Sequence, residues 1–152
     1  MLDKICQVYY GIVVLFSLML MRLLALIIFY LPIHKTKEKR EEKCIIIAHI
    51  CFRLMFILCP WIQVNSLDNS VWDQMRKDLK ANKGIMICMN HTSFLDAMIF
   101  SAYCPVDIII HFRTLLKYSL TQIPFFGPVV TQCGHFPVHF KSSQQGNFTT
   151  DK

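Results

Sequence analysis

A long apolar stretch near the N-terminus limits what this chain can fold into. Residues 8–31 are almost wholly apolar, with Arg22 as their one charge. As a helix rising about 1.5 Å per residue, they would cross a hydrocarbon core of roughly 30 Å. The stretch is longer than the apolar core of a signal peptide, and no small-residue cleavage site follows it. We therefore predict a transmembrane helix over residues 8–31, with the Arg22 side chain reaching toward the interface.

A charged loop and a second apolar segment follow. Residues 35–43 carry five cations and three anions, which is typical of a cytosolic loop. In residues 44–62, His49 and Arg53 are four positions apart and share one helical face. This segment could cross the membrane or lie in its interface. We expect the interfacial arrangement, with the polar face toward the headgroups and Pro60 ending the helix.

Composition and charge agree with a membrane protein. The chain is 54% hydrophobic and 17% charged, whereas about a quarter of the residues in soluble domains are charged. The net charge of +6 favours anionic lipid or an anionic substrate. The basic residues do not follow an aromatic-studded face, so we expect no nucleic-acid binding.

Beyond residue 64 the pattern predicts an α/β domain. Residues 85–89 and 107–111 are short apolar runs that predict strands, and a helix is expected between them over 93–103. Together they would form one right-handed βαβ crossover. An amphipathic helix over 70–82 should precede this unit.

The later segments complete the expected fold class. We expect a helix over 114–121 and a further strand within 129–138. The prediction is thus an N-terminal membrane helix pair followed by a mixed, βαβ-containing sheet flanked by helices. Its units are a membrane anchor (1–64), an α/β domain (65–141) and a polar tail (142–152).

The most informative motif is the heptad Asn-His-Thr-Ser-Phe-Leu-Asp at residues 90–96. Neutral imidazole is a suitable general base, and a carboxylate five residues later can orient His91 and support its charged form. Asp96 could equally be the N3 carboxylate of a capping box with Ser93 as the N-cap. The two roles are compatible.

A second block strengthens the functional interpretation. Residues 117–127 read Lys-Tyr-Ser-Leu-Thr-Gln-Ile-Pro-Phe-Phe-Gly, and Gly134 and Pro137 follow. Over residues 84–141, these ordered blocks resemble the glycerolipid acyltransferases, specifically the 1-acylglycerol-3-phosphate (lysophosphatidate) acyltransferase type.

The resemblance implies transfer of an acyl group from acyl-CoA, as co-substrate, to the free hydroxyl of a lysophospholipid, most simply lysophosphatidate. His91 would be the base and Asp96 its partner, with Asn90 and Ser93 shaping the loop. The expected reaction needs no metal, no other cofactor and no acyl-enzyme. It also implies an integral membrane protein of the endoplasmic reticulum or a related endomembrane, with its active site facing the cytosol.

The resemblance assigns the substrate phosphate to basic residues. Lys117 matches the family's block, and Arg113 lies close to it in sequence. Where the family has an arginine after Gly134, direct alignment gives Phe140, and a one-residue insertion brings Lys141 into register. Lys117 could otherwise be an ordinary surface lysine.

Two alternatives remain open. The family's later phosphate block and a further apolar block are absent, so the C-terminal part of the sheet would be missing. The chain would then be an inactive truncated isoform or fragment that acts only as a membrane-bound interaction protein. A zinc site is the other alternative, since two clusters offer nitrogen and sulfur ligands. These ligands are Cys88, His91, Cys133, His135 and His139.

Overall fold

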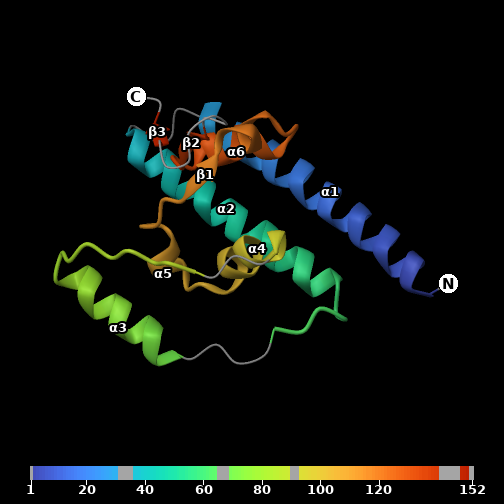
Figure 1. Ribbon diagram of the computed structural model, residues 1–152, viewed down its shortest axis with the longest axis horizontal. Coiled ribbons are helices and arrows are strands. Elements are labelled where there is room, and N and C mark those ends of the chain that lie inside the picture. The colour runs from blue at the N-terminus through green and yellow to red at the C-terminus, as the bar shows by residue number, and fades with distance from the viewer. Residues whose placement is uncertain (1, 31–35, 65–68, 90–92, 141–147, 151–152) are drawn as a thin grey trace.

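The computed structural model of the protein describes residues 2–30, 36–64, 69–89, 93–140 and 148–150. In this part the chain is mostly helical, with one small sheet (Figure 1). The elements are α1 (Leu2–Tyr30), α2 (Lys37–Leu58), α3 (Asn69–Lys80), α4 (Phe94–Tyr103), α5 (Val106–Ile109), β1 (Leu115–Lys117), the 3₁₀ helix η1 (Tyr118–Gln122), α6 (Phe126–Gln132), β2 (Phe136–Phe140) and β3 (Phe148–Thr150). In Figure 1, α3 lies at the edge of the molecule opposite α1.

Helix α1 is covered by protein on one face only. Its buried residues recur every four positions, which places them on one side of the helix; they are Val13, Ser17, Met21 and Ala25. This side packs against α2 and α6. The other side exposes apolar residues, among them Ile12, Leu15, Phe16, Met19 and Leu23. Of the described helices, α1 alone is long and apolar enough to cross a membrane.

Arg22, in the apolar part of α1, has a protein partner. Arg22 Nη1 donates a hydrogen bond to Gln132 Oε1 of α6 at 3.1 Å. The sequence predicted that this side chain would reach toward the membrane interface. The bond joins the apolar helix to an element more than one hundred residues away, and the position of the Arg22 side chain relative to a membrane stays a prediction.

Helix α2 begins earlier than expected and lies in the core. Thr36 is its N-cap and accepts from the Lys39 amide, so most of the charged run that we predicted as a loop forms the first turns. His49 is only 4% exposed, and its Nδ1 lies 2.8 Å from the Ser101 carbonyl oxygen. The expectation that His49 faces headgroups is therefore wrong, because α4 covers this side of α2; Arg53 is exposed.

The predicted helix over 93–103 is confirmed by α4, but the strand over 107–111 is wrong. Residues 106–109 form the short helix α5, with Pro105 as its N-cap. The Asp107 carboxylate accepts from Arg76 Nε of α3 at 2.7 Å, and the hydrogen bond lowers the pKa of Asp107. A short run of isoleucines suits a buried helical turn as well as a strand.

The expected strand over 85–89 also fails to form. These residues have no regular structure, and the Met86 side chain is 88% exposed. Because residues 107–111 do not supply a partner strand, the predicted ladder cannot form here. The βαβ unit expected over 85–111 is consequently not observed.

The small sheet lies later in the chain. Strand β1 pairs in parallel with β2, with Leu115 opposite Phe136 and Lys117 opposite Val138; β3 pairs antiparallel to β2. The helix predicted over 114–121 is instead β1 followed by η1. The strand predicted within 129–138 is divided between α6 and β2, and α6 forms part of the connection between the parallel strands.

A tight turn links η1 to α6. Phe125 has φ 64° and ψ −43°, and the Phe126 amide donates to the Pro124 carbonyl at 2.8 Å. This is a γ-turn with positive φ, a rare conformation that costs about 1–3 kcal/mol for a residue other than glycine. Gly127 follows, where an added Cβ would lie 1.9 Å from the Thr121 carbonyl oxygen. The turn is therefore closely packed onto η1.

Candidate active site

Asp96 is fixed at the start of α4. Ser93 is the N-cap, and its hydroxyl accepts from the Leu95 amide at 3.2 Å. In return, Asp96 Oδ2 accepts from the Ser93 amide at 2.8 Å. This reciprocal arrangement is the capping box that the sequence allowed. The hydrogen bond orients the Asp96 carboxylate and holds it at the first turn of α4.

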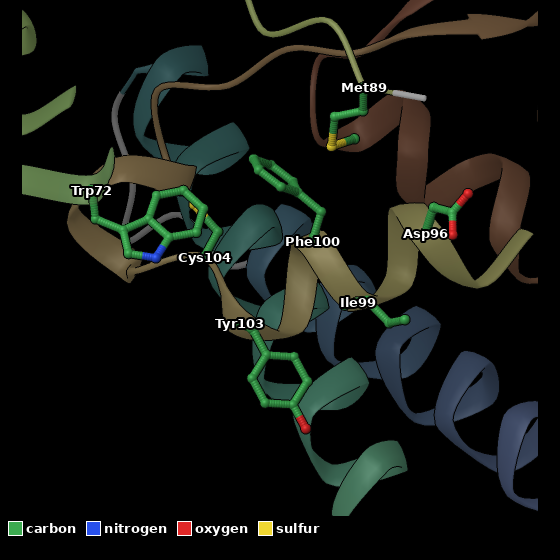
Figure 2. Close-up of a pocket in the computed structure, with 7 residues that line it drawn as sticks. All are labelled: Trp72, Met89, Asp96, Ile99, Phe100, Tyr103 and Cys104. Atoms are coloured by element: carbon green, nitrogen blue, oxygen red, sulfur yellow. The ribbon is translucent and has the colours of Figure 1, made fainter. Parts of the chain in front are cut away.

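The same carboxylate borders an apolar pocket. The pocket has a volume of about 270 Å³ and is lined by Trp72, Met89, Asp96, Ile99, Phe100, Tyr103 and Cys104. Figure 2 shows Asp96 at one end and Trp72 at the other, with Phe100 between them. The Trp72 and Phe100 rings are 6.1 Å apart. An apolar chain could lie along this wall with a polar reacting group at the Asp96 end.

Helix α4 joins this pocket to the core. Met98 and Ala102 are buried on the helix that packs against α2. Phe100 also contacts Phe112, with ring centroids 5.7 Å apart in an edge-to-face arrangement. The pocket wall is therefore one face of a well-packed helix.

Three predicted site residues lie outside the described residues. Asn90 and His91 belong to the stretch 90–92, and Lys141 belongs to the stretch 141–147. The residues on either side of the first stretch are described, and Met89 and Asp96 line the same pocket. The roles assigned to Asn90, His91 and Lys141 stay predictions.

Lys117 lies at the carboxyl end of β1 and is exposed. Because β1 and β2 are parallel, their carboxyl ends lie at the same edge of the sheet. Tyr118, which follows Lys117, stacks on His139 of β2 with ring centroids 4.1 Å apart. This edge joins the two segments to which the sequence assigned phosphate binding.

Arg113 has structural partners. Its Nη2 donates to Glu41 Oε2 at 3.1 Å, and its Nη1 donates to the carbonyls of Ile110 and Phe112. The Glu41 carboxylate also lies 3.7 Å from Lys37 Nζ. An added Cβ on Gly134, which has φ +74°, would come within 2.5 Å of that carboxylate.

Arg113 also lines a second pocket, of about 350 Å³, together with Lys83 and His111. Through its hydrogen bonds to Glu41 and to the two carbonyls, the Arg113 guanidinium connects the start of α2 to the segment that leads into β1. Phosphate binding by Arg113 stays a prediction.

His135 belongs to the same region. Its Nδ1 accepts from the Thr114 amide at 3.2 Å, and the Phe136 amide donates to the Thr114 carbonyl at 3.0 Å. Burial lowers the pKa of His135 to about 4, with a further lowering from Arg113 and an opposing effect from Glu41. The neutral imidazole therefore helps to hold β1 beside β2.

The sequence had only partial signals for these contacts. Trp72 lies on the apolar face of the amphipathic helix that the sequence predicted, so its burial was foreseeable. Glu41 belongs to the charged run 35–43, in which every side chain could be exposed to solvent. Nothing in the sequence of this run indicates that Glu41 is the residue that binds Arg113. Within the described residues, no group of three or more histidine, cysteine, aspartate and glutamate side chains could hold a metal ion.

Comparison with known proteins identifies the domain. The family model described as Acyltransferase matches residues 71–152, more than half of the chain. The chain belongs to the acyltransferase family. No curated protein and no solved structure matches it. The acyltransferase match begins within α3 and includes Asp96 and the Trp72 side of the pocket.

The low pKa of His135 predicts acid sensitivity in a defined window. The unfolded chain binds the proton near pH 6.5 and the folded chain near pH 4, so stability falls as the pH drops from about 7 toward 4. His135→Asn keeps a side-chain acceptor near Nδ1 and removes this titration. We expect a smaller decrease in melting temperature between pH 7 and pH 5 for His135→Asn than for the wild type.

His111→Asn is the matched control, because His111 is exposed. It should show the same decrease as the wild type. An undiminished decrease in His135→Asn would contradict the assignment of the proton to His135.

Proposed function

We propose that this acyltransferase moves an acyl group from acyl-CoA to the free hydroxyl of a lysophospholipid, with lysophosphatidate as the acceptor and phosphatidate as the product. The family match supports acyl transfer. The observation that carries the proposal is the Asp96 carboxylate, fixed by the Ser93 amide at one end of an apolar pocket. The pocket suits part of an acyl chain, and the carboxylate suits an acid–base pair with His91.

In the proposed reaction, His91 takes the proton of the acceptor hydroxyl as its oxygen attacks the thioester carbonyl. The tetrahedral intermediate then breaks its carbon–sulfur bond, and the imidazolium returns the proton to the departing thiolate of CoA. Asp96 orients the imidazole and stabilises its charged form. Asn90 and Ser93 support the loop. The hydroxyl oxygen itself is the nucleophile, so no acyl-enzyme is formed.

The phosphate of the acceptor would bind at the edge where β1 and β2 end. Lys117 is exposed there, and Lys141 follows the last residue of β2. Arg113 is held by Glu41 and two carbonyls, so we assign it a supporting electrostatic part. The ammonium groups of Lys117 and Lys141 would together provide two positive charges for a doubly charged headgroup.

We further propose that the chain is an integral membrane protein of the endoplasmic reticulum or a related endomembrane, with its active site in the cytosol. The exposed apolar face of α1 supports contact with lipid. The charged residues at the start of α2 suit the cytosolic side.

Substitutions at the acid–base pair test the reaction. His91→Ala should lower kcat by about 10²-fold or more, the usual effect of losing a general base. Asp96→Asn should also be severely impaired, although the amide retains an oxygen for the Ser93 amide. The measurement is transfer of radiolabelled acyl groups to lysophosphatidate by membranes containing equal amounts of each variant.

Asp107→Asn is the control, because Asp107 is an exposed carboxylate in the first turn of α5. It should retain wild-type kcat. Wild-type kcat in His91→Ala would exclude the proposed base.

Removal of one cation tests the phosphate site. Lys117→Met should raise KM for lysophosphatidate by about 10-fold or more, since a charge-assisted hydrogen bond contributes about 1.5–3 kcal/mol. KM for acyl-CoA should stay near the wild-type value. Lys80→Met removes an exposed lysine from α3 and should change neither constant. Equal effects of the two substitutions would indicate a general loss of surface charge.

Labelling in sealed microsomes tests the orientation. Cys88 is exposed and lies three residues before His91, so it is a native reporter of that loop. An added reporter, Lys39→Cys, marks the start of α2, and Cys6→Ser removes the half-buried thiol of α1. A membrane-impermeant maleimide added outside should label both reporters. Labelling of only one would place the two segments on opposite sides of the membrane.

A further inference from the structure

The γ-turn at Phe125 leaves a large apolar side chain partly exposed to solvent. Asparagine or glycine would adopt positive φ at lower cost than phenylalanine, yet the position is occupied by Phe125, which is 41% exposed. Phe125 is not among the buried core residues, so packing of its ring in the core does not explain the strain. Gly127 lies so close to the Thr121 carbonyl that a side chain there would clash, so the base of the turn is packed directly against η1. Backbone strain of this kind is typical of functional sites, and it directs attention to the side chain at this turn.

Other apolar side chains are exposed near Phe125 in the chain. Ile123 and Tyr118 are each 38% exposed, and both belong to the segment that leads into the turn. Leu115 and Phe136 are opposite each other in the parallel strand pair, and both are exposed. The η1–α6 unit and its sheet thus present apolar side chains together with the exposed cation of Lys117.

The turn lies close to the helix that suits lipid. Phe125 immediately precedes α6, which has seven residues and is therefore about 10 Å long. At the other end of α6, Gln132 accepts from Arg22 of α1. Helix α1 exposes an apolar face suited to acyl chains, and the chain's net charge of +6 suits anionic headgroups.

We propose that Phe125, Ile123 and Tyr118 form a second lipid-contacting surface, which inserts into the headgroup region of an anionic phospholipid bilayer beside α1. The inference relies on the proposed membrane contact of α1 and is independent of acyl transfer. Together, α1 and this surface hold the β1–β2 edge, with Lys117, close to the lipid surface. A lysophospholipid could then reach that edge without leaving the bilayer.

Tryptophan quenching tests the inference on the full chain. Phe125→Trp keeps an aromatic side chain at the strained position, and Ile123→Trp places the probe on the same turn at a residue with an ordinary φ of −69°. Each variant is reconstituted into phosphatidylcholine–phosphatidylglycerol vesicles with or without brominated acyl chains. After subtraction of the wild-type signal, the added emission of both variants should be quenched by the bromine atoms.

Two controls separate the possible outcomes. Ile12→Trp reports on the exposed face of α1, and Val71→Trp reports on α3 at the opposite edge of the molecule (Figure 1). Bromine quenching of the tryptophans at positions 12, 123 and 125, but not of the one at position 71, supports the inference. Quenching at 12 alone overturns it while leaving the membrane contact of α1 intact. Absence of quenching at all four positions refutes the membrane contact itself. Equal quenching at 71 and 125 shows that the turn is not a specific surface.

Discussion

The burial of α2 is the constraint on which the rest of the structure depends. This helix has α1 on one side and α4 on another, and it also contacts α5 and α6. Each large apolar side chain removed from water contributes about 1.5–3 kcal/mol, and Met55 and Phe56 are among those buried. The same packing encloses His49, whose desolvation is offset by its hydrogen bond to Ser101. Since the Ser101 carbonyl can only accept a hydrogen bond, the Nδ1 atom of His49 carries the proton in this contact.

The packing around α2 also determines the geometry of the candidate site. Helix α4 is fixed to α2 through Met98, Ala102 and the bond to His49, so its first turn has a defined place. Asp96 is in that turn, and Phe100 on the same helix forms the pocket wall. At the other end of α2, Glu41 holds Arg113 in the segment before β1. One central helix therefore connects both halves of the proposed acyltransferase site.

The sequence predicted local features better than tertiary ones. The capping box at Ser93 and Asp96 and the amphipathic character of α3 depend on neighbouring residues, and both were foreseeable. The run at 107–111 was misassigned, because three consecutive isoleucines do not distinguish a strand from a helical turn. His49 was misplaced for a different reason: its environment is set by α4, about fifty residues later. The positions of Arg22 and Glu41 likewise depend on partners that no local pattern reveals.

The hydrogen bond between Arg22 and Gln132 means that α1 does more than present an apolar surface. One side of the helix must fit α2 and α6, so its residues are restricted in shape as well as in polarity. The other side needs only to remain apolar. Over evolutionary time, the two sides should therefore accumulate substitutions at different rates, and an unrelated apolar helix of the same length would be a poor replacement. The buried side of α1 is, in this sense, part of the domain's core.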